Sequence, residues 1–220
     1  MKIGALIRCY HLTRYLKAIL KSLDYLDEVL VVNAKFKGTE DRPDATEDIV
    51  RELGQKNVTL LKEEHDGEEQ HEIIRAGLEV LWGCKYVFIN DADEFILRKD
   101  REEIVEQMAT QRAEVGFCHL IDYVSEPFHI PQQHYPFRGH RPTVIVKPST
   151  TFYNIRNIRY GNGIFFDKCV HHFGYTWNSD DMNWKHSFYE EAESKDLKDL
   201  TKRRKFDCKV PDEIMKLLEE

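Results

Sequence analysis

The sequence predicts an α/β fold in which helices flank a mixed, mainly parallel, Rossmann-like sheet. Two observations lead to this prediction. Short apolar runs alternate with segments whose apolar residues recur at helical spacing. The fourth apolar run ends abruptly in the carboxylates of Asp91, Asp93 and Glu94. The alternation implies right-handed crossovers and a largely parallel sheet covered on both faces, and carboxylates at a strand end lie where open α/β sheets bind ligands.

The first hundred residues are predicted to form four strands that alternate with three helices. The strands are expected at residues 3–9, 28–32 and 58–61 and in the apolar run that begins at Tyr86. The helices are expected at residues 12–23, 46–53 and 69–82. Thr46 is a candidate cap of the second helix, and Gly54 and Gly83 are expected to end the second and third.

The pattern changes after residue 100. We expect a charged helix to about residue 111, then strands at 115–123, 143–147 and 165–175, a charged helix at 195–205 and a terminal helix at 211–218. Residues 124–141 are rich in Pro, His and aromatic residues, and we interpret them as a lid or an acceptor-facing loop. The alternative is a packed surface excursion.

We interpret residues 1–220 as a single domain with three parts. A nucleotide-binding part is expected at about 1–100, an acceptor-side part at about 101–190, and a charged helical tail at about 191–220.

The composition excludes several classes of protein. Lys and Arg number 32 against 39 Asp and Glu, which gives a net charge of -7 and disfavours nucleic-acid binding. No apolar run approaches the ~20 residues that span a bilayer, and no leader pattern precedes the first strand, so a cytoplasmic protein is expected. The five cysteines are scattered and lack C-x-x-C spacing. We therefore expect reduced thiols packed in the core.

The carboxylates after the fourth strand predict a cation site. Asp91 and Asp93 stand two residues apart, so their side chains share a face if strand geometry persists. Hard oxygen ligands of this kind suit Mn²⁺ or Mg²⁺, and Mg²⁺ often completes its shell with water and substrate phosphates. The alternative interpretation is a solvated acidic turn.

Several stretches together resemble the GT-A nucleotide-sugar glycosyltransferases, particularly the inverting family 2 enzymes and their lipopolysaccharide-core-like members. They are Tyr10 after the first strand, Asn33 at the end of the second, the segment from Asp44 to Thr46, Arg75 sixteen residues before Asp91, the D-x-D itself, and His171-His172-Phe173-Gly174-Tyr175 followed by Lys185 and Tyr189. The chain departs from the family pattern where Asn33 replaces an aspartate that contacts the nucleotide base. An amide both donates and accepts hydrogen bonds, so base contact stays possible and uridine specificity is left open.

The resemblance implies a GT-A fold and a role for each matching residue. Asp93 would bind the cation, with Asp91 contacting the ribose, the sugar or the metal shell, and His172 would supply a third ligand, with His171 as its competitor. The nucleotide-sugar site would comprise Arg8, Tyr10, Asn33, Arg75 and Asp91.

The implied activity is metal-dependent transfer of a hexose-like sugar from a nucleoside-diphosphate sugar to a hydroxyl acceptor, which could be a glycan, a lipid-linked molecule or a small molecule. Such a reaction needs a base to deprotonate the acceptor, and Glu126 and Asp181 are the candidates. Two alternatives stay open: a nucleotidyltransferase acting on a sugar phosphate, and a non-catalytic nucleotide-sugar-binding module.

Overall fold

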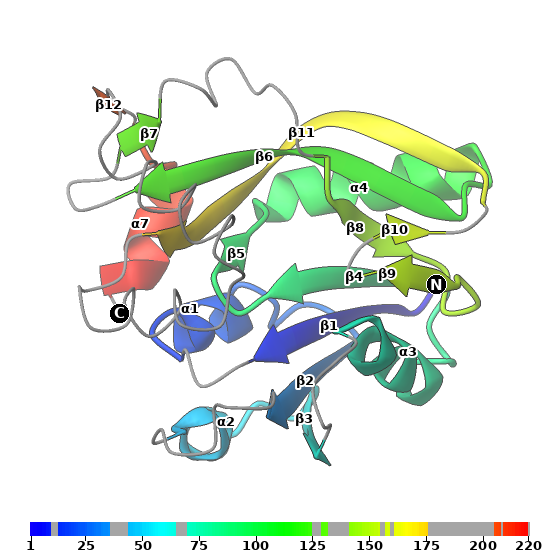
Figure 1. Ribbon diagram of the computed structural model, residues 1–220, viewed down its shortest axis with the longest axis horizontal. Coiled ribbons are helices and arrows are strands. Elements are labelled where there is room, and N and C mark those ends of the chain that lie inside the picture. Colours follow the sequence, from blue (N-terminus) through cyan, green and yellow to red (C-terminus); the bar gives the residue numbers. More distant parts are fainter. Residues whose placement is uncertain are drawn as a thin grey trace.

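A computed structural model of the chain describes ten segments, drawn in colour in Figure 1. They are residues 1–9, 13–35, 44–64, 70–124, 129–131, 141–154, 157–158, 161–175, 205–207 and 209–219.

A parallel half of the sheet comes first in the chain. Strand β1 (Ile3–Cys9) lies between β2 (Glu28–Lys35) and β4 (Tyr86–Asp91), and β3 (Val58–Glu64) pairs with β2; every one of these pairings is parallel. The connecting helices are α1 (Leu16–Lys21), α2 (Thr46–Leu53) and α3 (Gln70–Val80). The predicted alternation of strands and helices is therefore confirmed.

The second half continues the same sheet with mixed pairing. Strand β8 (Thr143–Val146) lies antiparallel between β4 and β6 (Val115–Val124), while β11 (Gly163–Tyr175) runs parallel to β6. The two-residue strand β5 (Glu94–Phe95) pairs antiparallel with β11 and so connects the end of β4 to the late strand. The predicted mixed α/β sheet is confirmed.

Short strands and two further helices complete the described chain. Strand β7 (His129–Pro131) pairs with β6 and with β12 (Lys205–Asp207), and β9 (Phe152–Asn154) pairs with β10 (Asn157–Ile158). The helices are α4 (Arg98–Thr110) and α7 (Asp212–Glu219).

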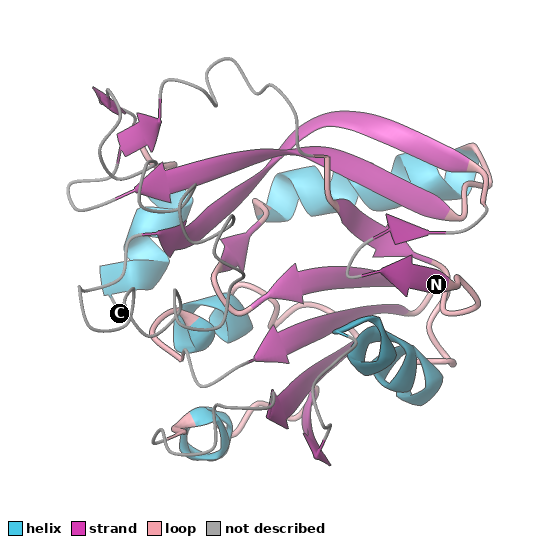
Figure 2. Cartoon of the chain, in the orientation of Figure 1, coloured by secondary structure: helices cyan, strands magenta, loops and turns pink. Residues whose placement is uncertain are grey.

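Helices cover both faces of the parallel strands (Figure 2). Along β1, Ala5, Ile7 and Cys9 pack into a core with α1, α2, α4 and α7, whereas Leu6 packs into a second core with α3. Strands buried on both faces read as continuous apolar runs, which is why their positions could be predicted from the sequence.

Several boundaries differ from expectation. Helix α1 starts at Leu16 rather than at residue 12, and β2 extends to Lys35. Thr46 is the first helical residue of α2 and Ala45 is its N-cap, so the expectation that Thr46 caps this helix is wrong. The Thr46 N–H donates a hydrogen bond to the side chain of Asp44 at 3.0 Å. Gly54 ends α2 with a φ of 56°, a left-handed conformation that glycine adopts without strain, as predicted.

Two predictions in the second half fall partly outside the described residues. The long loop at 124–141 contains the strand β7, which the sequence did not indicate. The charged helix expected at 195–205 lies outside the described part up to residue 204, and at Lys205 the prediction is wrong, since β12 begins there.

The four cysteines within the described residues, Cys9, Cys84, Cys118 and Cys169, are free thiols. Burial is the main cause that raises the pKa of Cys169 to about 11, and burial also raises the pKa of Cys118. The thiols of Cys118 and Cys169 therefore stay protonated near neutral pH. Cys208 lies outside the described residues.

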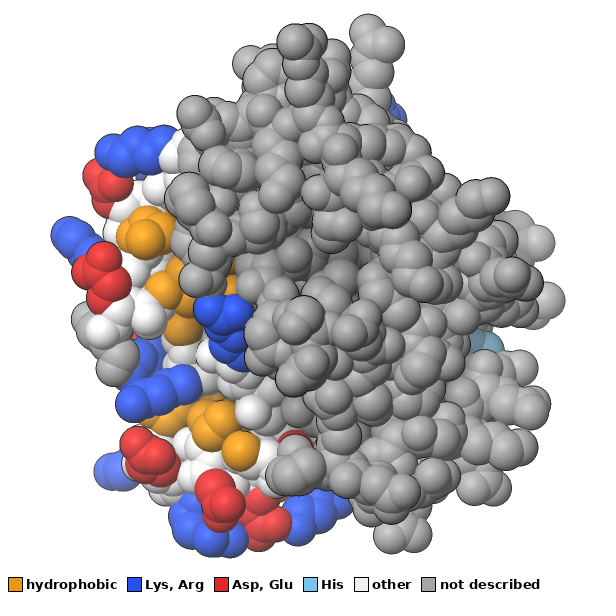
Figure 3. Space-filling model, turned by 60° about the vertical axis from the view of Figure 1, so that its left-hand side comes forward, with side chains coloured by type: hydrophobic (Ala, Val, Ile, Leu, Met, Phe, Trp, Pro, Cys, Tyr) orange, Lys and Arg blue, Asp and Glu red, His pale blue; other side chains and the backbone are white. Residues whose placement is uncertain are grey.

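Charges of both signs are interspersed over the described part of the face in Figure 3. Among the described residues, no helix is long and apolar enough to cross a membrane.

Candidate active site at the strand ends

The acidic turn after β4 is fixed at both ends. The backbone N–H of Asp91 donates a hydrogen bond to Oε2 of Glu94 at 3.0 Å. The carbonyl of Asp93 accepts a hydrogen bond from the N–H of Phe173, on β11, at 2.8 Å. Glu94 and Asp93 are both buried. The turn is therefore a preformed part of the sheet rather than a solvated acidic loop.

Asp93, His172 and Asp122 form a chain of three largely buried polar side chains. Nδ1 of His172 lies 2.6 Å from Oδ1 of Asp122, and Nε2 lies 3.5 Å from Oδ1 of Asp93. Because an ionised carboxylate only accepts hydrogen bonds, Nδ1 carries the proton in the bond to Asp122. This bond fixes the ring so that Nε2 faces Asp93.

Gly174 leaves the space in which these side chains meet. A Cβ atom at position 174 would lie 2.4 Å from Nε2 of His172 and 2.9 Å from Oδ2 of Asp93. Real Cβ atoms do not approach other heavy atoms this closely, so only glycine fits here without displacing the pair. The glycine of the late H-H-F-G-Y segment is thus part of the site.

The electrostatics of His172 reflect its two acidic neighbours. Burial alone would disfavour its charged form, but Asp93 and Asp122 outweigh burial and raise the pKa of His172 to about 10. Without a metal His172 is therefore protonated near neutral pH, and a cation that binds Nε2 must displace that proton.

His171 points the other way along β11. Its Nδ1 lies 2.9 Å from the hydroxyl of Tyr123, and the two rings stack within the core. Burial lowers the pKa of His171 to about 4, so this histidine is neutral near pH 7. Neighbouring strand residues face opposite sides, and His172 is the one that lies beside Asp93.

Asp91 has a different partner from Asp93. It forms an ion pair with Arg8, which occupies the matching register position on β1. The Arg8 side chain is largely buried, whereas that of Asp91 is 34% exposed. The expectation that Asp91 and Asp93 share a strand face does not apply, because β4 ends at Asp91 and Asp93 lies in the following turn.

The other residues predicted for the site are placed as follows. Asn33 lies in β2 two residues before the strand ends, next to Cys9 of β1 in register, and donates a hydrogen bond to Asp44. Arg75 lies on α3 with its side chain 71% exposed and 3.9 Å from Glu72, so the structure does not bring it to Asp91. Tyr10, Glu126 and Asp181 lie outside the described residues.

Sequence reasoning missed Asp122 and Asp44 as parts of the site. Asp122 lies two residues before the end of β6, and its position beside His172 depends on the parallel register of β6 and β11. No sequence signal specifies that register. Asp44 was visible as part of the D-A-T segment, but its contact with Asn33 depends on how α2 approaches β2.

No protein-family model matches the chain, and a search of curated proteins finds no match. Solved structures do match. S. aureus TarS residues 1–349 in complex with UDP is similar with a TM-score of 0.56 at 15% identity, over 90% of this chain and 69% of that one. The chain has a GT-A-like fold. The same TarS fragment with UDP-GlcNAc gives a TM-score of 0.55 at 15% identity, over 90% and 70% of the two chains.

A longer TarS structure shows how much of that protein the chain represents. It matches with a TM-score of 0.55 at 14% identity, over 91% of this chain but only 43% of TarS. At this level of identity the similarity establishes the fold and nothing about the site. The chain therefore corresponds to less than half of that TarS structure.

Proposed function

We propose that this chain is a metal-dependent glycosyltransferase that moves a sugar from a nucleoside-diphosphate sugar to a hydroxyl acceptor. The observation that carries the proposal is the arrangement of Asp93, His172 and Asp122 at the carboxyl ends of the strands in a GT-A-like fold. The UDP and UDP-GlcNAc complexes of TarS, which shares the fold, support the choice of donor class.

The residues present fit a divalent cation. Two atoms that each bind one ion at ~2.1 Å can be no more than ~4.2 Å apart, and Oδ1 of Asp93 and Nε2 of His172 are 3.5 Å apart. Among the described residues, no group of three or more His, Cys, Asp or Glu side chains forms a complete metal site. A cation held by Asp93 and His172 would therefore take further ligands from water and the donor phosphates.

Mn²⁺ or Mg²⁺ bound there would neutralise the charge that develops on the departing diphosphate. The protein groups around it have separate tasks. Asp122 orients His172, Glu94 fixes the turn that carries Asp93, and Arg8 holds Asp91 at the end of β4. We expect the partly exposed Asp91 carboxylate to contact the ribose or the sugar of the donor.

The acceptor side of the reaction rests on fewer observations. Asp122 is buried and hydrogen-bonded to His172, so its position does not suit a base that must reach an acceptor hydroxyl. Glu126 and Asp181 stay the candidates for that role. Glu126→Gln or Asp181→Asn should lower kcat for transfer, without weakening binding of the nucleoside diphosphate.

The proposal is tested by incubating the protein with a panel of nucleotide sugars, beginning with UDP-GlcNAc, in Mn²⁺ and measuring free nucleoside diphosphate. We expect release that depends on Mn²⁺, that is lost in Asp93→Asn and that persists in Asp167→Asn, whose carboxylate is fully exposed beside His119. Lack of turnover of every donor, together with lack of metal-dependent nucleotide binding, would overturn the proposal. Release of pyrophosphate from a nucleoside triphosphate and a sugar phosphate would support a nucleotidyltransferase instead.

A further inference from the structure

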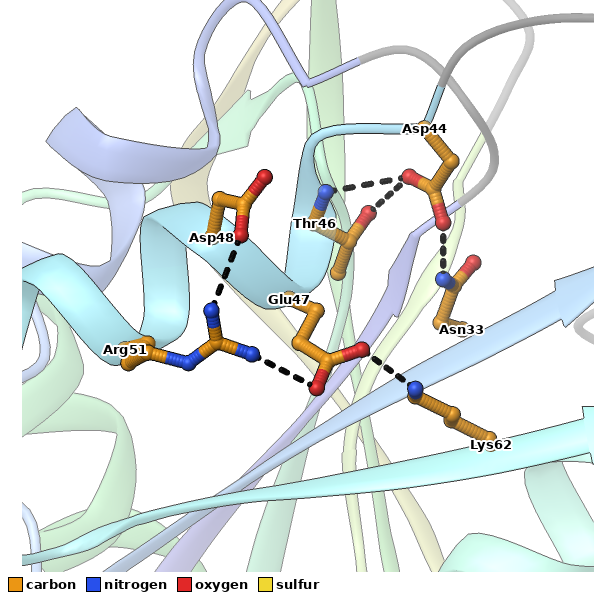
Figure 4. A network of polar contacts seen from close by, with 7 residues as sticks. All are labelled: Asn33, Asp44, Thr46, Glu47, Asp48, Arg51 and Lys62. Carbon is orange, nitrogen blue, oxygen red and sulfur yellow. Dashed lines mark hydrogen bonds and ion pairs between the residues drawn. The ribbon is translucent and has the colours of Figure 1, made fainter.

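A second polar network lies at the ends of β1 and β2, where α2 begins (Figure 4). The carboxylate of Asp44 lies between Asn33 and Thr46. Its Oδ1 accepts hydrogen bonds from the N–H of Thr46 at 3.0 Å and from the Thr46 hydroxyl at 2.6 Å. Its Oδ2 accepts a hydrogen bond from Nδ2 of Asn33. Both oxygens of Asp44 are therefore engaged.

This network determines which atom of Asn33 points outward. An ionised carboxylate can only accept hydrogen bonds, so the Asn33 amide must turn its NH₂ group toward Asp44. Figure 4 draws this contact through Nδ2, and the carbonyl oxygen Oδ1 of Asn33 takes no part in it. An amide that could otherwise rotate to present either atom is thereby fixed as a hydrogen-bond acceptor.

The support behind Asp44 is rigid. Thr46 is fully buried, and its hydroxyl also lies 3.2 Å from the thiol of Cys9 at the end of β1. Ion pairs of Glu47 with Lys62 on β3 and with Arg51 on α2 brace the start of the helix, although exposed pairs of this kind stabilise little. The orientation of Asp44 is therefore set by buried contacts at the Thr46 side.

The position of Asn33 suits contact with a nucleobase. Asn33 and Cys9 are register partners, and the preceding residue Arg8 pairs in register with Asp91 of β4. Strands β2 and β4 flank β1, so their ends are roughly 10 Å apart at the usual strand spacing. A nucleotide whose diphosphate lies near Asp93 can place its base over the end of β2.

We infer that Asp44 is a positioning residue that fixes Asn33 as the acceptor for a base carrying a ring N–H, as uracil and guanine do. This inference rests on the proposed nucleoside-diphosphate-sugar specificity. Uracil presents N3–H and guanine N1–H to Oδ1, whereas cytosine and adenine carry a lone pair on the corresponding ring nitrogen. A lone pair opposite a fixed carbonyl oxygen leaves both acceptors without a donor, which disfavours binding.

Asp44→Asn gives a sharp test. The N–H of Thr46 can only donate, so the introduced amide must keep its oxygen at Thr46 and turn its NH₂ toward Asn33. Asn33 must then rotate to accept that hydrogen bond, and its own NH₂ points outward as a donor. The preference should therefore shift toward bases with a ring acceptor, an outcome that general loosening of the loop does not produce.

The experiment measures the Kd values of UDP, GDP, CDP and ADP by calorimetry in Mn²⁺. For the natural sequence we expect UDP or GDP to bind at least about tenfold more tightly than CDP and ADP. In Asp44→Asn this preference for UDP or GDP over CDP and ADP should fall about tenfold or reverse. Asp48→Asn is the matched control, since it removes the same charge from an exposed residue of α2 that pairs with Arg51 and not with Asn33.

Three results would overturn the inference while leaving the proposed function intact. The first is equal affinity of the natural protein for all four nucleotides. The second is an unchanged preference for UDP or GDP over CDP and ADP in folded Asp44→Asn. The third is a loss of this preference in Asp48→Asn that is as large as in Asp44→Asn. If circular dichroism shows that Asp44→Asn is unfolded, Asn33→Ala decides: loss of the preference supports the inference, and its retention contradicts it. Absence of binding by any nucleotide contradicts the inference and the proposed function together.

Discussion

At the scale of single residues, neighbouring histidines on β11 have opposite environments. His171 is buried against Tyr123 and is neutral, whereas His172 lies between two carboxylates. The alternation of side chains along a strand predicts that only one of them can face the cation site. Which one it is depends on the position of β11 beside β5 and β6, and that position is fixed by packing.

Asp122 should control the affinity of the site for metal. Asp122→Asn weakens the hydrogen bond that fixes the ring of His172. Mutation of a residue that orients a metal ligand in this way typically lowers metal affinity by about 10- to 100-fold. We expect the Kd for Mn²⁺, measured by calorimetry on the protein without nucleotide, to rise by that factor. Asp167→Asn also alters a carboxylate beside a histidine, His119, but should leave the Kd unchanged. Equal effects of the two substitutions would contradict the role of Asp122.

Gly174 should be essential to the geometry of the site. In Gly174→Ala the new methyl group collides with His172 and Asp93, so we expect loss of Mn²⁺ binding in a protein that still folds. Gly163→Ala on the same strand is the control, because the atoms nearest to its methyl group, from 2.9 Å, belong to the ring of Phe117 and not to His172 or Asp93. Retention of Mn²⁺ affinity in Gly174→Ala would show that the close approach is not required.

The acidic residues of the candidate site could be predicted because they are adjacent in the sequence. Asp91, Asp93 and Glu94 follow a single apolar run, and the structure places them in one fixed turn. Asp122 could not be predicted as a partner of His172, because the two are fifty residues apart and meet only through strand pairing. Arg75 shows the opposite error. It was predicted to belong to the site because of its spacing from Asp91, but its exposed side chain is not brought into contact with Asp91.

At the scale of elements, α3 lies unusually close to the parallel strands. A Cβ atom at Gly77 would lie 1.9 Å from Cδ1 of Leu6 on β1 and 3.4 Å from Cγ2 of Val32 on β2. Glycine is normally unfavourable inside a helix by about 1 kcal/mol relative to alanine. Here it allows the helix to approach the strands whose ends carry the site.

Gly77→Ala should therefore destabilise the protein despite the gain in helix propensity. Overpacking of a well-packed core costs about 1–3 kcal/mol, which we expect as a decrease in the free energy of unfolding measured with urea. Gly83→Ala, whose methyl group would meet only the end of the Lys2 side chain at 4.0 Å, should be close to neutral. A stabilised Gly77→Ala variant would mean that α3 can move away from β1 at little cost.

The elements of the first half could be predicted because each has a strong local pattern. Strands β1, β2 and β4 are largely buried apolar runs, and the edge strand β3 packs the half-buried Val58, Leu60 and Leu61 against the two cores. The helices between these strands are amphipathic. Strands β5, β7 and β12 could not be predicted, since they have two or three residues each and exist through pairing with distant partners. The strand β5 matters most for the site, because it carries Glu94 and pairs with β11 at His172.

At the scale of the whole molecule, buried His171 should make stability depend on pH. Burial lowers the folded-state pKa of His171 to about 4, against 6.5 in the unfolded chain, although Asp100 opposes the shift. Between these values the unfolded state binds the proton and the folded state does not, so stability falls as pH decreases from 6.5 to 4. The loss should total roughly 3 kcal/mol.

The comparison of His171→Gln with the natural protein tests this linkage. The free energy of unfolding of both proteins is measured with urea in metal-free buffer at pH 4 to 7. As the pH falls, the variant should become increasingly stable relative to the natural protein. A difference that stays constant over this range would mean that His171 takes up its proton in the folded state as easily as in the unfolded one.

The whole site joins the two halves of the molecule. The parallel half contributes Arg8, Asp91 and Asn33, and the mixed half contributes Asp122 and His172. The turn that carries Asp93 connects them, since it follows β4 and leads into β5. A nucleotide and a cation bound together would therefore contact both halves, and each should strengthen binding of the other by the same factor.

The central claim is that Asp93 and His172 hold a divalent cation together with a nucleoside diphosphate. The most direct test is electron paramagnetic resonance of free Mn²⁺ during titration of the protein, with and without UDP. We predict one bound Mn²⁺ per chain, tighter binding in the presence of UDP, and loss of binding in Asp93→Asn and in His172→Ala. Mn²⁺ binding that is unchanged by both substitutions, or unaffected by any nucleoside diphosphate, would contradict it.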